Sequence, residues 1–149
     1  MNKILYIKDN SLFLFDNGKI KLLYSDLKSL KYNKKFLIFV SKDKNNNNLY
    51  IFDAIKNNFK KVTVDNIHNY SFAINLKGKV TLEDGKNLYL LNNKLEKIYE
   101  STSYKIYIEN IDWLTDDIIL MHIDGYYFHI PDKYFDTINI KTKNVENYL

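Results

Sequence analysis

The sequence predicts an all-β protein built from about four repeated antiparallel meanders of ~38 residues each. Three observations support this fold class: a short apolar motif recurs at near-constant spacing, Asn-Gly and Asp-Gly pairs separate apolar runs, and the composition disfavours helices. Ala occurs twice in 149 residues, whereas Ile, Tyr and Phe are abundant. β-Branched and aromatic side chains suit pleated, half-buried surfaces. The length fits a single domain, residues 1–149.

The recurring motif alternates apolar and aromatic residues and usually ends on Asp or Asn. Its copies are Leu12–Asp16, Leu49–Asp53, Leu88–Asn92 and Tyr126–Ile130, and their first residues are 37, 39 and 38 residues apart. One apolar stretch precedes each copy: Ile4–Ile7, Phe36–Val40, Phe72–Leu76 and Ile118–Ile123. Another follows each copy: Ile20–Tyr24, Lys61–Val64, Leu95–Tyr99 and Ile138–Lys141. Each unit is therefore expected to hold at least three strands.

Turn residues separate these stretches. Asn17-Gly18 and Asp124-Gly125 are the strongest hairpin signals, because Asn, Asp and Gly tolerate the positive φ of tight turns. A two-residue turn at Asp124-Gly125 would place Ile123 opposite Tyr126. Further turns are expected at Asn45–Asn48, Asn57-Asn58, Asp84-Gly85 and Asn92-Asn93. The segment Ser25–Leu30 is expected to form a turn or short helix.

The period and the strand count resemble those of β-propeller repeats. The fourth unit resembles them most, since the aromatic–acidic segment Ile111–Asp117 leads into Ile118–Ile123, a Gly turn and Tyr126–Ile130. This resemblance implies a small propeller-like fold, with Val145–Leu149 available to complete the first unit. The alternatives are a meander barrel and a β-sandwich.

Several classes of protein are disfavoured by composition. Cys is absent, so disulfides and thiolate chemistry are excluded. The start of the chain has no apolar signal region, and no apolar run approaches the ~20 residues of a membrane helix, so we expect a cytoplasmic protein without membrane contact. No phosphate-binding, zinc or nucleophile motif occurs, so we expect no cofactor, no metal and no catalytic residues.

Charge is distributed unevenly. Residues 1–75 hold 13 Lys and 6 acidic residues, a net +7, and residues 76–149 hold 9 Lys and 12 acidic residues, a net −3. The acidic part favours a basic partner, although Asp also serves turns by bonding the local backbone. A nucleic-acid partner is disfavoured, because Arg is absent and the Lys residues are scattered as on protected edge strands.

These features predict a non-catalytic protein-binding module. We expect its partner-binding residues to be acidic and aromatic side chains of the fourth unit: Asp112, Trp113, Asp116, Asp117, Asp124 and Tyr126. Trp113 serves either as a binding anchor or as a structural residue between units.

In length and composition the chain resembles the immunity proteins of bacterial toxin systems, including contact-dependent growth inhibition. The resemblance implies an inhibitor that blocks a basic toxin domain, such as a nuclease. One alternative is a nuclease or metal-dependent hydrolase that uses His122 and His129, which the predicted hairpin places diagonally on one face. Another is a structural repeat subunit of a larger assembly, which predicts an oligomer.

Overall fold

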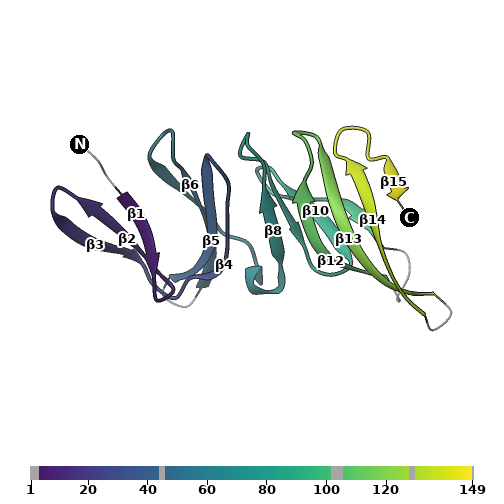
Figure 1. The fold of residues 1–149 in the computed structure, drawn as a ribbon, viewed down its shortest axis with the longest axis horizontal. Coiled ribbons are helices and arrows are strands. Elements are labelled where there is room, and N and C mark those ends of the chain that lie inside the picture. The colour runs from purple at the N-terminus through teal and green to yellow at the C-terminus, as the bar shows by residue number, and fades with distance from the viewer. Residues whose placement is uncertain (1–3, 44–45, 102–105, 128–129, 149) are drawn as a thin grey trace. The chain divides into compact units, whose positions relative to one another are not determined.

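In the computed structural model, which describes residues 4–43, 46–101, 106–127 and 130–148, strands form four antiparallel sheets (Figure 1). In each sheet consecutive strands are neighbours, so each sheet is a meander. One 3₁₀ turn, η1 (Ile67–Asn69), is present. The predicted all-β class with four repeated meanders is confirmed. Over the described residues no sheet closes into a barrel, because each has two edge strands.

The first sheet has three strands: β1 (Ile4–Lys8), β2 (Ser11–Asp16) and β3 (Lys19–Tyr24). The predicted hairpin between β2 and β3 is confirmed. Asn17 and Gly18 both have positive φ, +50° and +77°, as a two-residue turn of this type requires. The register follows directly, with Asp16 opposite Lys19 and Phe15 opposite Ile20.

The second sheet has four strands: β4 (Lys28–Tyr32), β5 (Phe36–Asp43), β6 (Asn46–Asp53) and β7 (Asn58–Val62). Two predictions fail here. Half of Ser25–Leu30 belongs to β4, where Ser29 has a φ of +51° at a register shift, so a bulge stands in place of the expected turn or helix. Of the expected turn Asn45–Asn48, residues 46–48 begin β6, and Asn45 lies outside the described residues.

The third and fourth sheets also have four strands each. The third comprises β8 (Ser71–Ile74), β9 (Val80–Glu83), β10 (Asn87–Leu91) and β11 (Leu95–Glu100). The fourth comprises β12 (Ile106–Trp113), β13 (Ile118–Tyr127), β14 (Ile130–Asn139) and β15 (Val145–Tyr148). Strands β9 and β12 were not predicted: β9 is short, and a register shift between Ile108 and Asn110 breaks the alternation of β12.

The predicted turn at Asp124-Gly125 is wrong, because β13 runs through both residues without interruption (Figure 1). Neither residue has positive φ, and Gly125 pairs with Ile106 on one side and Asp132 on the other. The alternation of buried residues along β13 continues through Gly125, so this Asp-Gly pair extends the strand. The fourth motif copy, Tyr126–Ile130, consequently spans the end of β13 and the start of β14.

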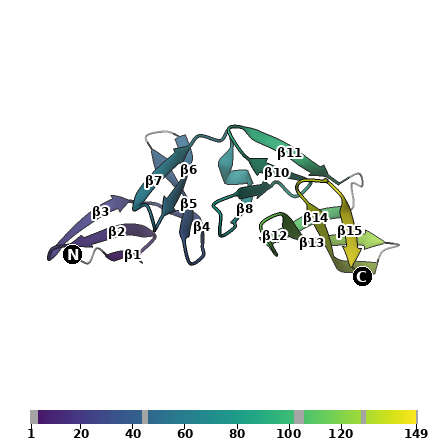
Figure 2. The ribbon, with the colours of Figure 1, turned by 90° about the horizontal axis from the view of Figure 1, so that it is seen from above.

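Strand β15 pairs with β14 at the edge of the fourth sheet (Figure 2). The expected use of Val145–Leu149 to complete the first unit is therefore wrong, and the first sheet keeps three strands. The β14–β15 register places Thr137 opposite Glu146 and Ile138 opposite Val145.

The chain divides into two compact units, Met1–Tyr32 with Leu37–His68 (unit 1) and Asn33–Phe36 with Asn69–Leu149 (unit 2). In unit 1 the first and second sheets meet around Tyr24, whose ring lies 5.2 Å from that of Phe39 and 4.5 Å from that of Tyr50. Buried Leu12 belongs to this cluster. The prediction of a single domain remains a prediction.

In unit 2 the third and fourth sheets share one aliphatic core. Its fully buried members include Leu88, Ile119, Met121, Ile123 and Ile138. The first residue of the motif is equally buried in three copies: Leu12, Leu49 and Leu88 are 1%, 0% and 0% exposed. The repeat thus reflects an equivalent core position in three successive sheets.

We predict that Leu88→Ala lowers the free energy of unfolding of unit 2 by about 2–5 kcal/mol, because it removes buried methyl groups and leaves a cavity. The matched control is Leu114→Ala at a side chain that is 56% exposed, where the loss should stay within ~0.5 kcal/mol. Urea unfolding monitored by circular dichroism measures both. Equal effects would contradict the assignment of Leu88 to the core.

Candidate functional site

The outer face of the fourth sheet, opposite the unit 2 core, carries exposed apolar side chains. Along β13, Ile119, Met121 and Ile123 are fully buried, whereas Leu120 and His122 between them are half-buried. The alternation of side chains across a strand explains this pattern. The register continues it into β14, where Leu120 lies opposite Thr137 and His122 opposite Phe135.

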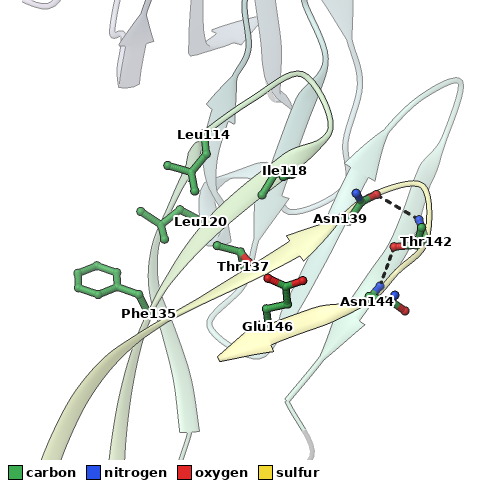
Figure 3. Close-up of a pocket in the computed structure, with 9 residues that line it drawn as sticks. All are labelled: Leu114, Ile118, Leu120, Phe135, Thr137, Asn139, Thr142, Asn144 and Glu146. Atoms are coloured by element: carbon green, nitrogen blue, oxygen red, sulfur yellow. Dashed lines mark hydrogen bonds between the residues drawn. The ribbon is translucent and has the colours of Figure 1, made fainter. Parts of the chain in front are cut away.

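A groove of about 580 Å³ lies on this outer face (Figure 3). Its apolar part contains Leu114, which is 56% exposed, Phe135, which is 46% exposed, and the side chains of Ile118 and Leu120. Thr137, Asn139, Thr142, Asn144 and Glu146 line the remainder. We call this hollow the groove.

The polar end of the groove is a structured turn between β14 and β15. The side-chain oxygen of Asn139 accepts a hydrogen bond from the backbone N–H group of Lys141 at 3.0 Å. It accepts a second one from the N–H group of Thr142 at 3.2 Å (Figure 3). The hydroxyl of Thr142 accepts one from the N–H of Asn144 at 3.3 Å. These bonds fix the turn beside Glu146, so the groove is held by ordered backbone on this side.

His122 borders the apolar part of the same face. Its ring stacks on Phe135 with centroids 4.9 Å apart, and its Nδ1 lies 3.2 Å from a carboxylate oxygen of Glu109. The predicted hairpin register, which placed His122 diagonally from His129 on one face, is wrong because His122 pairs with Phe135. His129 lies outside the described residues.

Two of the predicted binding residues share this outer face with the groove. Asp112 is exposed and lies opposite Leu120, and half-buried Asp124 lies opposite Tyr107. Tyr126 occupies a position on β13 opposite Pro131, but its side chain lies outside the described part. The structure therefore places Asp112 opposite Leu120, which lines the groove. Asp124 lies four residues beyond Leu120 on β13, a distance of roughly 13 Å by strand rise.

Trp113 takes the opposite face of β12. It pairs with Ile119 and packs against the unit 2 core, which agrees with its structural interpretation. Its indole Nε1 is buried and has no hydrogen-bond partner among the described residues. Asp136 also faces inward beside Met121, where it is 4% exposed, and burial raises the pKa of its carboxyl group.

Asp116 and Asp117, the other two predicted binding residues, are held in ion pairs. Asp116 lies 2.7 Å from Lys77, and the two oxygens of Asp117 lie 2.7 Å from Lys79 and 2.6 Å from Lys141. We call these five residues the lysine–aspartate cluster. It joins the turn after β8, the β12–β13 connection and the turn after β14, so these carboxylates are largely neutralised within unit 2.

The cluster favours the ionised form of Asp117. Its hydrogen bonds and charge interactions with Lys141 and Lys79 lower the pKa of the Asp117 carboxyl group from 3.8 to about 2. A backbone contact supports the same geometry, because the N–H of Ile140 donates to the Asp117 carbonyl at 2.9 Å. The sequence indicated a binding surface at Asp116 and Asp117 because both are acidic. It could not reveal their ion pairs, since the three Lys partners lie far from them in the chain.

The groove itself was not predicted. Its apolar members, Leu114, Ile118, Leu120 and Phe135, come from a connection and two strands, and the sequence shows them as ordinary strand residues. The one available signal was the period-2 pattern of β13, which is apolar on both faces around Leu120.

The sequence matches no protein-family profile and no curated protein. In the described part of the chain, no helix has the length and apolar character needed to span a membrane. Among the same residues, no three or more His, Asp or Glu side chains gather in a way that could hold a metal ion.

We predict that the stability contributed by Asp117 depends on pH. Because folding lowers its pKa to about 2, this contribution is present above pH ~4 and is lost as the pH falls through ~2. The free energy of unfolding of Asp117→Asn should therefore lie below that of the wild type at pH 6, and this gap should shrink towards pH 2.

The control is Lys141→Met, which leaves the pair between Asp117 and Lys79 intact. Carboxyl carbon NMR should show the pKa of Asp117 rising only part of the way towards 3.8 in this variant. An unchanged Asp117 pKa would contradict the role of Lys141.

Proposed function

We propose that this protein is a non-catalytic protein-binding module whose docking surface is the outer face of the fourth sheet. The observation that carries the proposal is the groove, where Leu114 and Phe135 are 56% and 46% exposed. Adjacent exposed apolar side chains mark interaction sites, because covering them removes apolar area from water at about 25 cal/mol per Å². The lining favours binding over acid–base chemistry, since Glu146 is the one titratable side chain among its described residues.

The acidic residues around the groove indicate the charge of the partner. Asp112 and Glu146 lie beside the groove, and Asp124 lies further along the same face. Carboxylates around an apolar centre accelerate the approach of a basic protein and align it, while the apolar centre supplies most of the affinity. In its most concrete form, the module is an immunity or inhibitor protein that covers a basic surface of a bacterial toxin.

We expect Leu120→Lys to abolish partner binding, because it places a charge at the apolar centre of the interface. The affinity should fall at least thirtyfold. This fall corresponds to a loss of ~2 kcal/mol in binding free energy, which is typical of a hot-spot residue. Affinity capture from cells that express the protein, followed by titration calorimetry with the captured partner, measures this loss. The matched control, Ile55→Lys, alters a side chain of unit 1 that is 72% exposed and should bind normally. Normal binding by Leu120→Lys would remove the groove from the interface.

We expect the double variant Asp112→Lys, Asp124→Lys to slow association with a basic partner by tenfold or more at low salt. Its association rate should also depend less on salt than that of the wild type. Stopped-flow mixing at several salt concentrations measures both quantities. Asp116 and Asp117 are unsuitable for this test because their reversal would break the lysine–aspartate cluster. A double variant whose rate equals that of the wild type would exclude steering by these carboxylates.

A further inference from the structure

Strand β15 forms one edge of the fourth sheet, and β14 is its one neighbouring strand among the described residues (Figure 2). The two strands pair without a register shift along β15 from Val145 to Tyr148. Val145 is 40% exposed, and Glu146 is also exposed. The described part of unit 2 therefore leaves the outer edge of β15 open to solvent.

The backbone hydrogen bonds of β14 alternate between its two neighbouring strands. The N–H of Asn139 donates to the carbonyl of Asn144, directly before β15, at 3.0 Å. The N–H of the next residue, Ile140, donates to the carbonyl of Asp117, on the β13 side, at 2.9 Å. Because this alternation continues along an antiparallel strand, every second residue of β14, counted back from Asn139, bonds β15.

The same alternation assigns the backbone groups of β15. Thr137 lies two residues before Asn139 and pairs with Glu146, so the N–H and C=O groups of Glu146 are directed at β14. The N–H and C=O groups of Val145 and Asn147 are then directed away from β14. The open edge of β15 thus presents backbone donors and acceptors in the spacing that a further strand requires.

Among the described strands, the other sheet edges are each protected against pairing. Natural edge strands are protected by Lys residues, by bulges or by a covering element. A bulge at Ile108–Asn110 interrupts β12, and β8 lies beside β12. Strand β15 has neither a Lys residue nor a register shift. The remaining edge strands, β1, β3, β4, β7 and β11, contain Lys8, Lys19, Lys28, Lys60 and Lys97 respectively.

An open edge of this kind is a template for a further strand, because main-chain hydrogen bonds supply affinity and alternate side chains supply specificity. We propose that an extended segment of the partner adds antiparallel to β15 as a fifth strand of the fourth sheet. The edge is continuous with the groove, since Glu146 of β15 lines the groove. This inference rests on the proposed function, because the added strand belongs to the partner that covers the groove.

The register indicates which side chains the added strand carries. Glu146 lies on the outer face in one row with Leu120 and Thr137 (Figure 3). The added residue opposite Glu146 lies on the same face beside the groove, and a Lys or Arg there meets an opposite charge. Val145 lies opposite Ile138 on the core face and is 40% exposed. An apolar residue opposite Val145 extends the apolar core at this edge.

Charge disfavours a second copy of β15 as the added strand. An antiparallel pair of β15 strands that uses the outward groups of both Val145 and Asn147 places Glu146 opposite Glu146. Like charges directly opposite each other destabilise paired strands. The segment that fits the edge is therefore a basic strand of another protein. Sedimentation of the protein alone at twice 17.8 kDa, lost in Val145→Pro, would show a second copy at this edge and overturn the proposal.

A short peptide tests the edge directly. The probe is acetyl-Thr-Val-Lys-Val-Thr-amide, which places its Lys opposite Glu146 and a Val opposite Val145. In protein labelled with nitrogen-15, the amide signals of Val145 and Asn147 should shift on titration with a Kd of about 1 mM, since ordering a short peptide is costly. Both amides should also exchange more slowly with heavy water. No shift of these two signals at about 10 mM probe would overturn the proposal.

Two altered peptides are the matched controls, and neither depends on the folding of a protein variant. Methylation of both Val nitrogens removes the N–H groups that would bond the open edge, so this peptide should not bind detectably. Replacement of the Lys by Glu puts a like charge opposite Glu146 and should weaken binding at least fivefold. A methylated peptide that binds as tightly as the probe would contradict strand addition.

The substitution Val145→Pro tests the same edge from the side of the protein. It removes an outward N–H without removing a hydrogen bond inside the sheet, and edge strands tolerate Pro at such positions. Its thermal unfolding by circular dichroism should resemble that of the wild type, whereas its affinity for the probe should fall at least tenfold. Val145→Ala keeps the N–H and should bind the probe almost normally. Equal affinities of Val145→Pro and the wild type would refute the added strand.

Failure of this inference and failure of the proposed function give different results. A captured partner that Leu120→Lys loses and Val145→Pro still binds normally overturns the added strand and keeps the groove as a binding site. A captured partner that both variants bind normally overturns both. A partner that both variants lose, together with binding of the probe at Val145 and Asn147, supports both.

Discussion

Each strand of this protein presents its side chains alternately to two faces of a sheet, and an apolar face is stable only when something covers it. Strand β13 illustrates the constraint. Ile119, Met121 and Ile123 fill the core of unit 2, and Leu120 on the other face of the strand is left beside the groove. The core and the candidate binding surface therefore come from the same strand. A one-residue shift of register would exchange them.

Electrostatics divides the acidic residues of the fourth sheet into two groups. In the lysine–aspartate cluster the charge of Asp117 is balanced by Lys79 and Lys141, and a partner would have to compete with both ammonium groups. Asp112 lies opposite Leu120 and Glu146 lines the groove, where the basic partner that we propose would meet apolar side chains as well as carboxylates. Internal pairing stabilises the connections of unit 2, whereas the proposed role of the carboxylates around the groove is long-range attraction of a basic partner.

Local signals predicted much of the fold, and their failures have a common cause. Asn17-Gly18 forms its expected turn because the residues on either side pair in the hairpin register that a two-residue turn requires. Asp124-Gly125 carries nearly the same signal, but the pairing of Gly125 with both Ile106 and Asp132 keeps the segment extended. Turn propensity is a local property, whereas strand pairing is decided by residues distant in the chain.

The candidate site was predictable only in part for the same reason. Asp112 and Trp113 are adjacent in sequence, yet Asp112 is exposed on the outer face, and Trp113 packs against the core. The residue types of Asp112 and Trp113 do not show which of them faces outward from β12. The face was decided by the bulge at Ile108–Asn110, which resets the alternation along the strand.

In strand β3, the face on which the apolar residues lie is decided by the folded chain and not by the local sequence pattern. Its Lys-Ile-Lys-Leu alternation suggests that Ile20 and Leu22 face inward, because a half-buried strand normally turns its apolar face to the core. The core position is instead taken by Tyr24, beyond a register shift, where its ring meets Phe39, Tyr50 and Phe59. Ile20 and Leu22 are thereby left on the opposite face of the first sheet.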